Sequence, residues 1–286
     1  MSYAYELGIK LTLADFEKYA KEIPCINAVV PSGPYTVVDF HYAGGVMNVM
    51  KMLESKLYTD VPSMYGNTWA DMLSRVKAQE NKVIHSLEKP LFNEPGLKIL
   101  RGNLSPNGAI VRPTAVYDEV KYMKGKAKVF EGDRPAFEAI MAGEIVPGDI
   151  IVIRYEGCKG APGMKELMLS IDALIGLGLD KSVGLISDAR FSGFNYGAII
   201  GHVSPEAYDG GNIALVENGD EIVIDIPNGE VSMLVSEEEL ERRRAAWVCP
   251  PLKEEKGCLN IFAKMCRPAE EGGAMQPWDL DAKFHR

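Results

Sequence analysis

The sequence lacks the features that define several large classes of protein. Its five cysteines form an odd set without a Cys-x-x-Cys pair, which argues against a disulfide framework. No stretch approaches the roughly 18 consecutive apolar residues of a membrane span, and residues 1–7 lack the basic region of a signal peptide. Basic residues are outnumbered, 31 against 40 acidic, for a net charge of −9. These absences predict a cytoplasmic protein with reduced thiols that binds neither membrane nor nucleic acid.

The cysteines also match no usual metal site. Cys249, Cys258 and Cys266 are separated by eight and seven residues, which are not the spacings of zinc or iron–sulfur ligands. Cys158 lies in a glycine-rich loop, where an ordinary thiol is favoured over a metal ligand. We therefore expect no cluster held by this chain's cysteines alone.

The first 92 residues have helical patterns. Thr12 with Asp15 resembles a helix cap, and apolar residues then recur at helical spacing. Two more helices are predicted over residues 46–53 and 68–76. At 286 residues and 47% hydrophobic composition, the chain can bury a sizeable core in one or two domains.

From residue 97 the pattern changes to short strands and turns. Strands are predicted at 99–100, 109–111, 127–130, 150–153, 183–186, 213–216, 221–226 and 231–235. The Asn-Gly pairs at 218–219 and 228–229 predict hairpins. Asp133 is expected to cap a helix over 134–142, and Ser236 to cap a charged helix to about 247. The fold class is therefore α+β, with a helical segment before the strands.

Two of these strands end in polar, glycine-rich loops. In the first loop, Glu166 stands just before a helical pattern and either caps that helix or binds a hard metal ion. Spacing alone favours the cap. In the second loop, Asp188, Arg190 and Ser192 fall within five residues. Ser192 is a nucleophile, a base or an ordinary turn residue, and the absence of a Gly-x-Ser-x-Gly elbow disfavours a hydrolase.

Several stretches resemble the signatures of the dihydroxy-acid and sugar-acid dehydratase family, in family order. They are residues 101–109, 154–157 (Arg-Tyr-Glu-Gly), 162–164 (Pro-Gly-Met), 188–193 (Asp-Ala-Arg-Phe-Ser-Gly) and 201–207 (Gly-His-Val-Ser-Pro-Glu-Ala). The resemblance covers nearly the whole chain, which looks like only the C-terminal half of a family member. It implies a helical segment 1–92 that resembles the end of the family's N-terminal domain, then a swivelling β-barrel-like domain over residues 93–248, and a wrapping tail 249–286 that is closer to the sugar-acid branch.

The resemblance also implies an activity: the conversion of a 2,3-dihydroxy acid or sugar acid to a 2-oxo acid. Ser192 matches the catalytic serine, which acts as an alkoxide base near a 2Fe-2S cluster, and Glu166 matches a ligand of Mg²⁺. A positive centre is needed because hydroxide is a poor leaving group. Arg190 and the amides from Gly193 onward are expected to hold the substrate carboxylate.

Four further residues complete the expected site. Phe194 stands where sugar-acid members tend to have threonine, so it either alters the substrate range or merely packs. His202 is expected to brace the serine loop, Asp188 to support it, and His285 to resemble a tail histidine that reaches the site in some sugar-acid members.

The resemblance further implies what this chain does not supply. The family's cluster cysteines, further acidic magnesium ligands and lysine belong to the N-terminal half, so we expect an oligomer in which an N-terminal-half chain or homologous subunit completes the site. Two alternatives remain open: a catalytically inactive relative that serves as a binding or regulatory module, and a small subunit of an aconitase-like hydratase.

Overall fold

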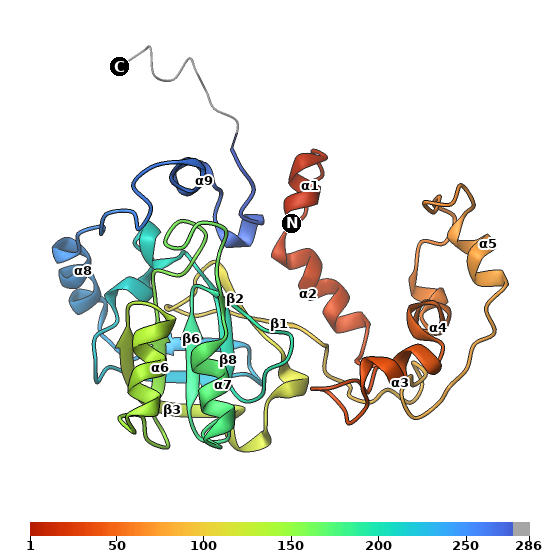
Figure 1. Ribbon diagram of the computed structural model, residues 1–286, viewed down its shortest axis with the longest axis horizontal. Coiled ribbons are helices and arrows are strands. Elements are labelled where there is room, and N and C mark those ends of the chain that lie inside the picture. The colour runs from red at the N-terminus through yellow and green to blue at the C-terminus, as the bar shows by residue number, and fades with distance from the viewer. Residues whose placement is uncertain (277–286) are drawn as a thin grey trace, which may run out of the picture. The chain divides into compact units, whose positions relative to one another are not determined.

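The computed structural model, which describes residues 1–276, places the β-branched runs in an eight-stranded mixed sheet (Figure 1). The strands in spatial order are β1 (Lys98–Leu100), β2 (Gly108–Val111), β8 (Ile199–Ser204), β6 (Gly184–Ser187), β4 (Ile150–Ile153), β3 (Tyr122–Phe130), β9 (Glu221–Asp225) and β10 (Glu230–Met233). The central strands β8, β6, β4 and β3 run parallel, and the outer pairs are antiparallel.

The two edge strands of this sheet meet at Arg101. Its amide donates to the carbonyl of Gly229 at 2.8 Å, and its carbonyl accepts from the amide of Val231 at 2.9 Å. Arg101 and Glu230 thus form a parallel bridge between the ends of β1 and β10. Because the edges are joined, the sheet is nearly closed and barrel-like, which confirms the mixed helix and strand content and the barrel-like sheet expected for this region.

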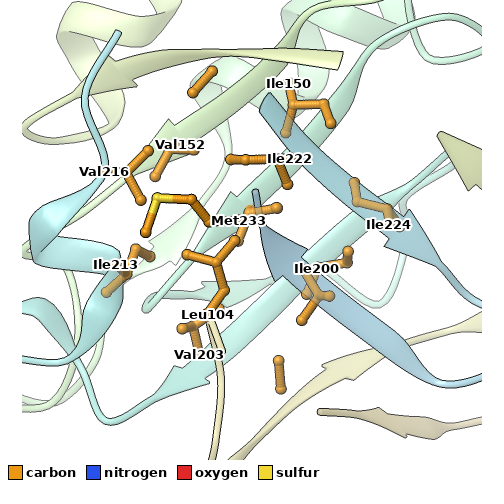
Figure 2. Close-up of a cluster of buried hydrophobic side chains, with 14 of the residues drawn as sticks. Leu104, Ile150, Val152, Ile200, Val203, Ile213, Val216, Ile222, Ile224 and Met233 are labelled. Carbon is orange, nitrogen blue, oxygen red and sulfur yellow. The ribbon is translucent and has the colours of Figure 1, made fainter. Parts of the chain in front are cut away.

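The central strands are buried on both faces, and their side chains alternate between two cores. Ile150 and Val152 belong to the cluster inside the barrel, whereas Ile151 and Ile153 belong to a second cluster outside it. Figure 2 shows Ile150, Val152, Ile200 and Ile224 converging on the inner cluster. This is why the run Ile150–Ile153 is apolar at every position.

Two helices cover the outer core. They are α6 (Asp133–Met141) and α7 (Leu169–Gly176), which lie side by side in Figure 1. Asp133 does not cap α6 as predicted: its carboxylate accepts from the amides of Leu169 at 3.2 Å and Ser170 at 3.0 Å, at the start of α7. Asp133 therefore joins the two helices, because amides of the first turn have no partner within their own helix.

The strand predicted over residues 213–216 is wrong. This segment forms a short 3₁₀ helix, η5 (Asn212–Leu215). The Arg154 guanidinium donates hydrogen bonds to the carbonyl oxygens of Ala214 at 2.6 Å and Val216 at 3.1 Å. These oxygens are therefore bound by a side chain rather than by a neighbouring strand. The hairpin predicted at 228–229 is confirmed, since it joins the antiparallel strands β9 and β10.

Residues 18–96 form a separate unit from residues 1–17 together with those from 97 onward. Its helices α3 (Val37–Tyr42), α4 (Gly45–Met52) and α5 (Trp69–Ser74) include both helices predicted there. The helix predicted after Thr12 is α2 (Leu13–Glu22), which spans the boundary. Among the described residues, no helix is both long and apolar enough to cross a bilayer.

The remaining elements are short. They are α1 (Ser2–Glu6), α8 (Glu237–Ala246), α9 (Cys258–Met265), β5 (Glu166–Leu167), β7 (Arg190–Phe191), η1 (Glu54–Lys56), η2 (Pro113–Ala115), η3 (Asp118–Val120), η4 (Ala207–Asp209) and η6 (Ala269–Glu271). The predicted cap of α8 is confirmed, since the Ser236 hydroxyl accepts from the Glu239 amide at 3.3 Å.

Candidate active site

The two polar loops leave the sheet side by side. Ile153 and Ser187 are register partners at the ends of the parallel strands β4 and β6, so the following residues start from one edge of the sheet, where binding sites of parallel sheets form. Asp188, fully buried, joins these loops. Its carboxylate accepts from the amides of Tyr155 at 3.1 Å, Glu156 at 3.0 Å and Ala207 at 3.0 Å. Burial raises the pKa of Asp188 to about 6, against the opposing effect of these amides.

A second buried carboxylate, Glu206, holds the glycine-rich loop. It accepts from the amides of Lys159 at 2.9 Å and Gly160 at 3.1 Å. Burial, followed by the charge of Asp188, raises the pKa of Glu206 to about 7. A Cβ atom at Gly157 would lie 2.4 Å from a Glu206 carboxylate oxygen, so only glycine fits there. Sequence reasoning missed the role of Glu206, although it lies within the 201–207 motif and follows a Ser-Pro pair.

Glu166 and Arg190 are brought together by a small parallel sheet. They are register partners in the pairing of β5 with β7, so both side chains project from the same face. The Arg190 amide donates to the carbonyl of Lys165 at 3.0 Å, and its Nε donates to the carbonyl of Met164 at 2.7 Å. Glu166 is half-buried and Arg190 is exposed. The helix-cap interpretation of Glu166 is wrong, because α7 begins three residues later and Asp133 binds its first amides.

Ser192 lies in a turn directly after β7. It is half-buried, and its hydroxyl oxygen accepts from the amide of Phe194 at 3.1 Å. The carbonyl of Gly193 accepts from the guanidinium of Arg112, a contact that no sequence motif indicated. Phe194 is 58% exposed and meets the Tyr196 ring edge to face at 5.8 Å. Its side chain therefore does not belong to the core.

His202 is held in an unusual backbone conformation. Its φ of 56° is left-handed, which is rare outside glycine, and its ring meets the Phe191 ring edge to face at 5.9 Å. Burial, with a smaller effect of the Arg190 charge, lowers the pKa of His202 to about 4. The imidazole is therefore neutral at pH 7. His285 lies outside the described residues.

A pocket of about 380 Å³ lies beside Arg190 and His202. Most of its wall is apolar, and the lining includes Leu13, Phe16, Ile99, Ile110, Met164 and Phe262. Glu166 and Ser192 do not line it. Glu166 is the register partner of Arg190, which does, and Ser192 directly follows the strand β7 that contains Arg190. The pocket thus has one cationic side chain, one neutral imidazole and an apolar interior.

The donor set does not fit a complete metal centre. No group of three or more His, Cys, Asp or Glu side chains able to hold a metal ion occurs within residues 1–276. Glu166 is a single carboxylate, and all five thiols are free. A hard cation requires several oxygen ligands and an iron–sulfur cluster requires several thiolates. The described residues therefore account for at most one ligand of the centre expected by resemblance.

Comparison with known proteins gives two family matches. Residues 82–273 match the C-terminal domain of dihydroxy-acid/6-phosphogluconate dehydratases, and residues 1–72 match the N-terminal domain of the same family. The two matches together show that the chain has residues of both domains of the family and is not a C-terminal domain alone.

Three similar curated proteins share one name. Dihydroxy-acid dehydratases from Clostridium novyi, Pyrobaculum neutrophilum and Geobacter sulfurreducens are 45%, 43% and 44% identical to this chain over 279, 282 and 272 residues. These alignments cover 96%, 97% and 95% of the chain but 50%, 50% and 49% of the relatives. The chain thus spans about half the length of the curated relatives it matches. None of the three is named as a sugar-acid enzyme, so the expected position in the sugar-acid branch has no support.

Proposed function

Because the chain belongs to the dihydroxy-acid/6-phosphogluconate dehydratase family, we propose that it takes part in the dehydration of a 2,3-dihydroxy acid to a 2-oxo acid. The observation that carries this proposal is the arrangement at the sheet edge, where Glu166 and Arg190 are paired and Ser192 follows at once. These residue types match the needs of the reaction: a base, a group that binds the substrate carboxylate, and a carboxylate ligand for the cation that stabilises the leaving hydroxide.

The pocket beside Arg190 favours an aliphatic dihydroxy acid over a sugar acid. A sugar acid carries a hydroxyl on nearly every carbon, and each hydroxyl that is buried without a partner costs free energy. The pocket wall is mostly Leu, Ile, Phe and Met, which suits a short branched hydrocarbon tail. The names of the relatives agree with this choice.

Each residue has a proposed role in the reaction. The guanidinium of Arg190 binds the substrate carboxylate, since it has no ion-pair partner among the described residues. Ser192 takes the proton from C2, and the C3 hydroxyl leaves, which gives an enol that becomes the 2-oxo acid. Water is thus lost and no oxidant is consumed. The Phe194 amide, 3.1 Å from the Ser192 oxygen, stabilises negative charge on that oxygen.

Glu166 is the one described residue that we propose as a ligand of the magnesium ion implied by the family. A cation and a cluster would supply the positive charge that stabilises the leaving hydroxide. The described residues do not complete either site. Asp188, Glu206 and His202 are positioning residues that fix the two loops.

We further propose that a segment equivalent to the other half of the relatives completes the site, on the same polypeptide or on a second subunit of a cytoplasmic oligomer. The two competing interpretations, an inactive binding module and an aconitase-like small subunit, receive no support from the family matches or from the names of the relatives.

The proposal is tested with the chain assembled with such a segment. We expect 2-oxo acid to form from 2,3-dihydroxy-3-methylbutanoate faster than from a six-carbon sugar acid. Ser192→Ala should lower kcat by about 10² to 10⁴-fold with unchanged binding. Ser182→Ala is the matched control, since within residues 1–276 the Ser182 hydroxyl donates to the Leu179 carbonyl, away from the candidate site. Full activity of Ser192→Ala would refute its role as base, and no turnover of either substrate by the assembled protein would refute the dehydratase proposal.

A further inference from the structure

Three sulfur-bearing side chains form a small cluster apart from the main cores. Cys158, Met164 and Cys266 are 3%, 7% and 2% exposed and pack together with Phe262 and Ala269 around them. We propose that this sulfur cluster is a binding site for one soft d¹⁰ cation, with Cu(I) as the physiological candidate. Thiolate and thioether sulfur are the ligands that select Cu(I) over harder ions.

The separation of the Cys158 and Met164 sulfur atoms suits such an ion. The Cys158 Sγ lies 3.8 Å from the Met164 Sδ. If each metal–sulfur bond is about 2.3 Å, as in zinc thiolates, three ligands at trigonal angles are separated by about 4 Å. The third sulfur, on Cys266, belongs to the same buried cluster. Its Sγ has a contact of 3.7 Å to the Ala263 carbonyl, which is weak enough to be given up for a metal bond.

Two residues with left-handed backbone lie beside Cys158. Met164 has a left-handed φ of 60°, which turns the chain so that the thioether approaches Cys158. Strain of this kind in a long apolar residue is uncommon and often marks a functional position. Gly273, whose φ is 61°, is the second, and a Cβ there would lie 3.1 Å from the Cys158 sulfur.

Access to the sulfur atoms is through the pocket beside Arg190. Cys158, Met164 and Gly273 all line that pocket, so a small ion can reach the cluster without unfolding the protein. The other three cysteines differ in this respect: Cys249 and Cys258 are exposed, Cys25 is half-buried, and none of them lines the pocket. The fold therefore places Cys158 at the pocket and Cys266 in the cluster behind it, apart from the other three cysteines.

The charges around the cluster favour a cation. Burial raises the pKa of Cys158 to about 12, and the next causes include the charges of Glu206 and Glu270. The same carboxylates that disfavour a bare thiolate attract a positive ion. Binding is an exchange in which the cation forms bonds to two thiolate sulfurs and one thioether, and the two thiol protons leave to solvent. No oxidation or reduction takes place.

A bound cation would change the loop and the pocket together. Cys158 and Met164 lie in the loop that leads to Glu166, whereas Cys266 follows helix α9. A metal shared by these residues cross-links the loop to the C-terminal segment and fills part of the pocket. This inference does not depend on the proposed dehydratase function, because binding is measured without turnover.

The test is a competition for Cu(I) between the chain and bicinchoninate in oxygen-free buffer. We expect the chain to remove one equivalent of Cu(I) from the chelate and to show an ultraviolet thiolate-to-metal charge-transfer band. The double substitution Cys158→Ala with Cys266→Ala should weaken this binding by more than about 100-fold. Loss of a residue that merely supports a metal ligand can already cost about 100-fold, and here two ligands are removed. Met164→Leu, which conserves volume, should weaken it on the order of 10-fold.

The exposed cysteines provide the matched control. Cys249→Ala with Cys258→Ala removes two thiols and should leave the competition unchanged. Met164→Leu is the safeguard against misfolding, since it keeps both thiols and the apolar packing, and its circular dichroism spectrum should match that of the parent chain. If one equivalent still binds after loss of Cys158 and Cys266, or if binding follows Cys249 and Cys258, the proposed site is refuted.

Discussion

Glu166 and Arg190 are opposite one another in the two-stranded parallel sheet of β5 and β7. One strand belongs to each of the two polar loops, so this pairing fixes an acidic and a basic side chain on a common face. Neither has an ion-pair partner among residues 1–276. An acidic and a basic side chain that share a face and have no ion pair of their own suit a site in which one binds a cation and the other a carboxylate.

Arg190→Lys tests the carboxylate role. Lysine keeps the charge but loses the planar fork that binds a carboxylate through two parallel hydrogen bonds. We expect KM to rise by about 10-fold, equivalent to roughly 1.4 kcal/mol, with a smaller change in kcat. Steady-state kinetics of the assembled enzyme measure both constants. Arg134→Lys, at an exposed position of α6, is the control, and an unchanged KM in Arg190→Lys would remove Arg190 from the substrate site.

Glu206 should make stability depend on pH. Its pKa is about 7 in the folded protein and near 4.5 when exposed, so between these values the folded state binds more protons than the unfolded state. The free energy of unfolding should therefore fall as pH rises from about 4.5 to 7 and then level off. Asp188, with a pKa of about 6, contributes in the same direction at slightly lower pH.

Glu206→Gln isolates the contribution of this residue. Glutamine keeps a carbonyl acceptor for the Lys159 and Gly160 amides and cannot ionise. The difference in unfolding free energy between parent and variant should change by roughly 3 kcal/mol between pH 4.5 and 7.5, with the variant gaining relative stability at the higher pH. Urea denaturation across this range measures it. A difference that does not vary with pH would mean that Glu206 is already ionised in the fold.

Gly157→Ala should destabilise the glycine-rich loop. The added Cβ would lie 2.4 Å from a Glu206 oxygen and 2.8 Å from its Cβ, so the buried side chain must shift, at a cost of about 1 to 3 kcal/mol. Gly176→Ala, at the end of α7 with nothing within 4 Å of the new Cβ, should be neutral or stabilising by up to about 1 kcal/mol. Thermal unfolding compares the two, and equal effects would show that Gly157 is not tightly packed.

The strands of the barrel were the part of the fold most accessible from sequence. Residues 150–153 and the hairpin at Asn228-Gly229 carry strong local signals, an apolar run and a turn that requires glycine. The segment 213–216 has the same apolar character but is a 3₁₀ helix, because the Arg154 guanidinium, 60 residues away, takes its carbonyl oxygens. A partner so distant in sequence leaves no local signal.

The candidate site shows the same division. Motifs identified Ser192, Arg190 and Glu166, but the pairing of Glu166 with Arg190 depends on β5 and β7, strands of two residues each. Such strands are too short for any periodic pattern. The roles of Asp133 and Glu206 depend on amides far away in sequence. Sequence therefore named the candidate residues, whereas the contacts that hold them required three-dimensional structure.

His202→Asn tests whether this histidine positions the loop that carries Ser192 or transfers protons. Asparagine tolerates the left-handed conformation of residue 202. Since the pKa of His202 is lowered to about 4, its imidazole does not titrate between pH 5 and 8. The profile of kcat/KM against pH should keep its shape in this range while the overall value falls on the order of 10-fold, because contact with Phe191 is lost. His41→Asn is the exposed control, and loss of a limb of the profile would assign proton transfer to His202.

The last prediction concerns completion of the site by a second segment. The reaction requires positive charge at the leaving hydroxyl, and the described residues offer one carboxylate ligand and no set of three. We expect the chain alone to hold less than one 2Fe-2S cluster and to be inactive, and to gain both cluster and activity when co-expressed with a polypeptide matching the other half of the relatives. Iron and sulfide analysis after anaerobic purification measures the first and 2-oxo acid formation the second. Ser192→Ala provides the control, since it should bind the partner and the cluster without turnover.

A full cluster on the isolated chain would contradict this account, because the ligands would then have to include cysteines of this chain. A stable complex that carries the cluster but converts neither dihydroxy acid nor sugar acid would instead restore the regulatory interpretation.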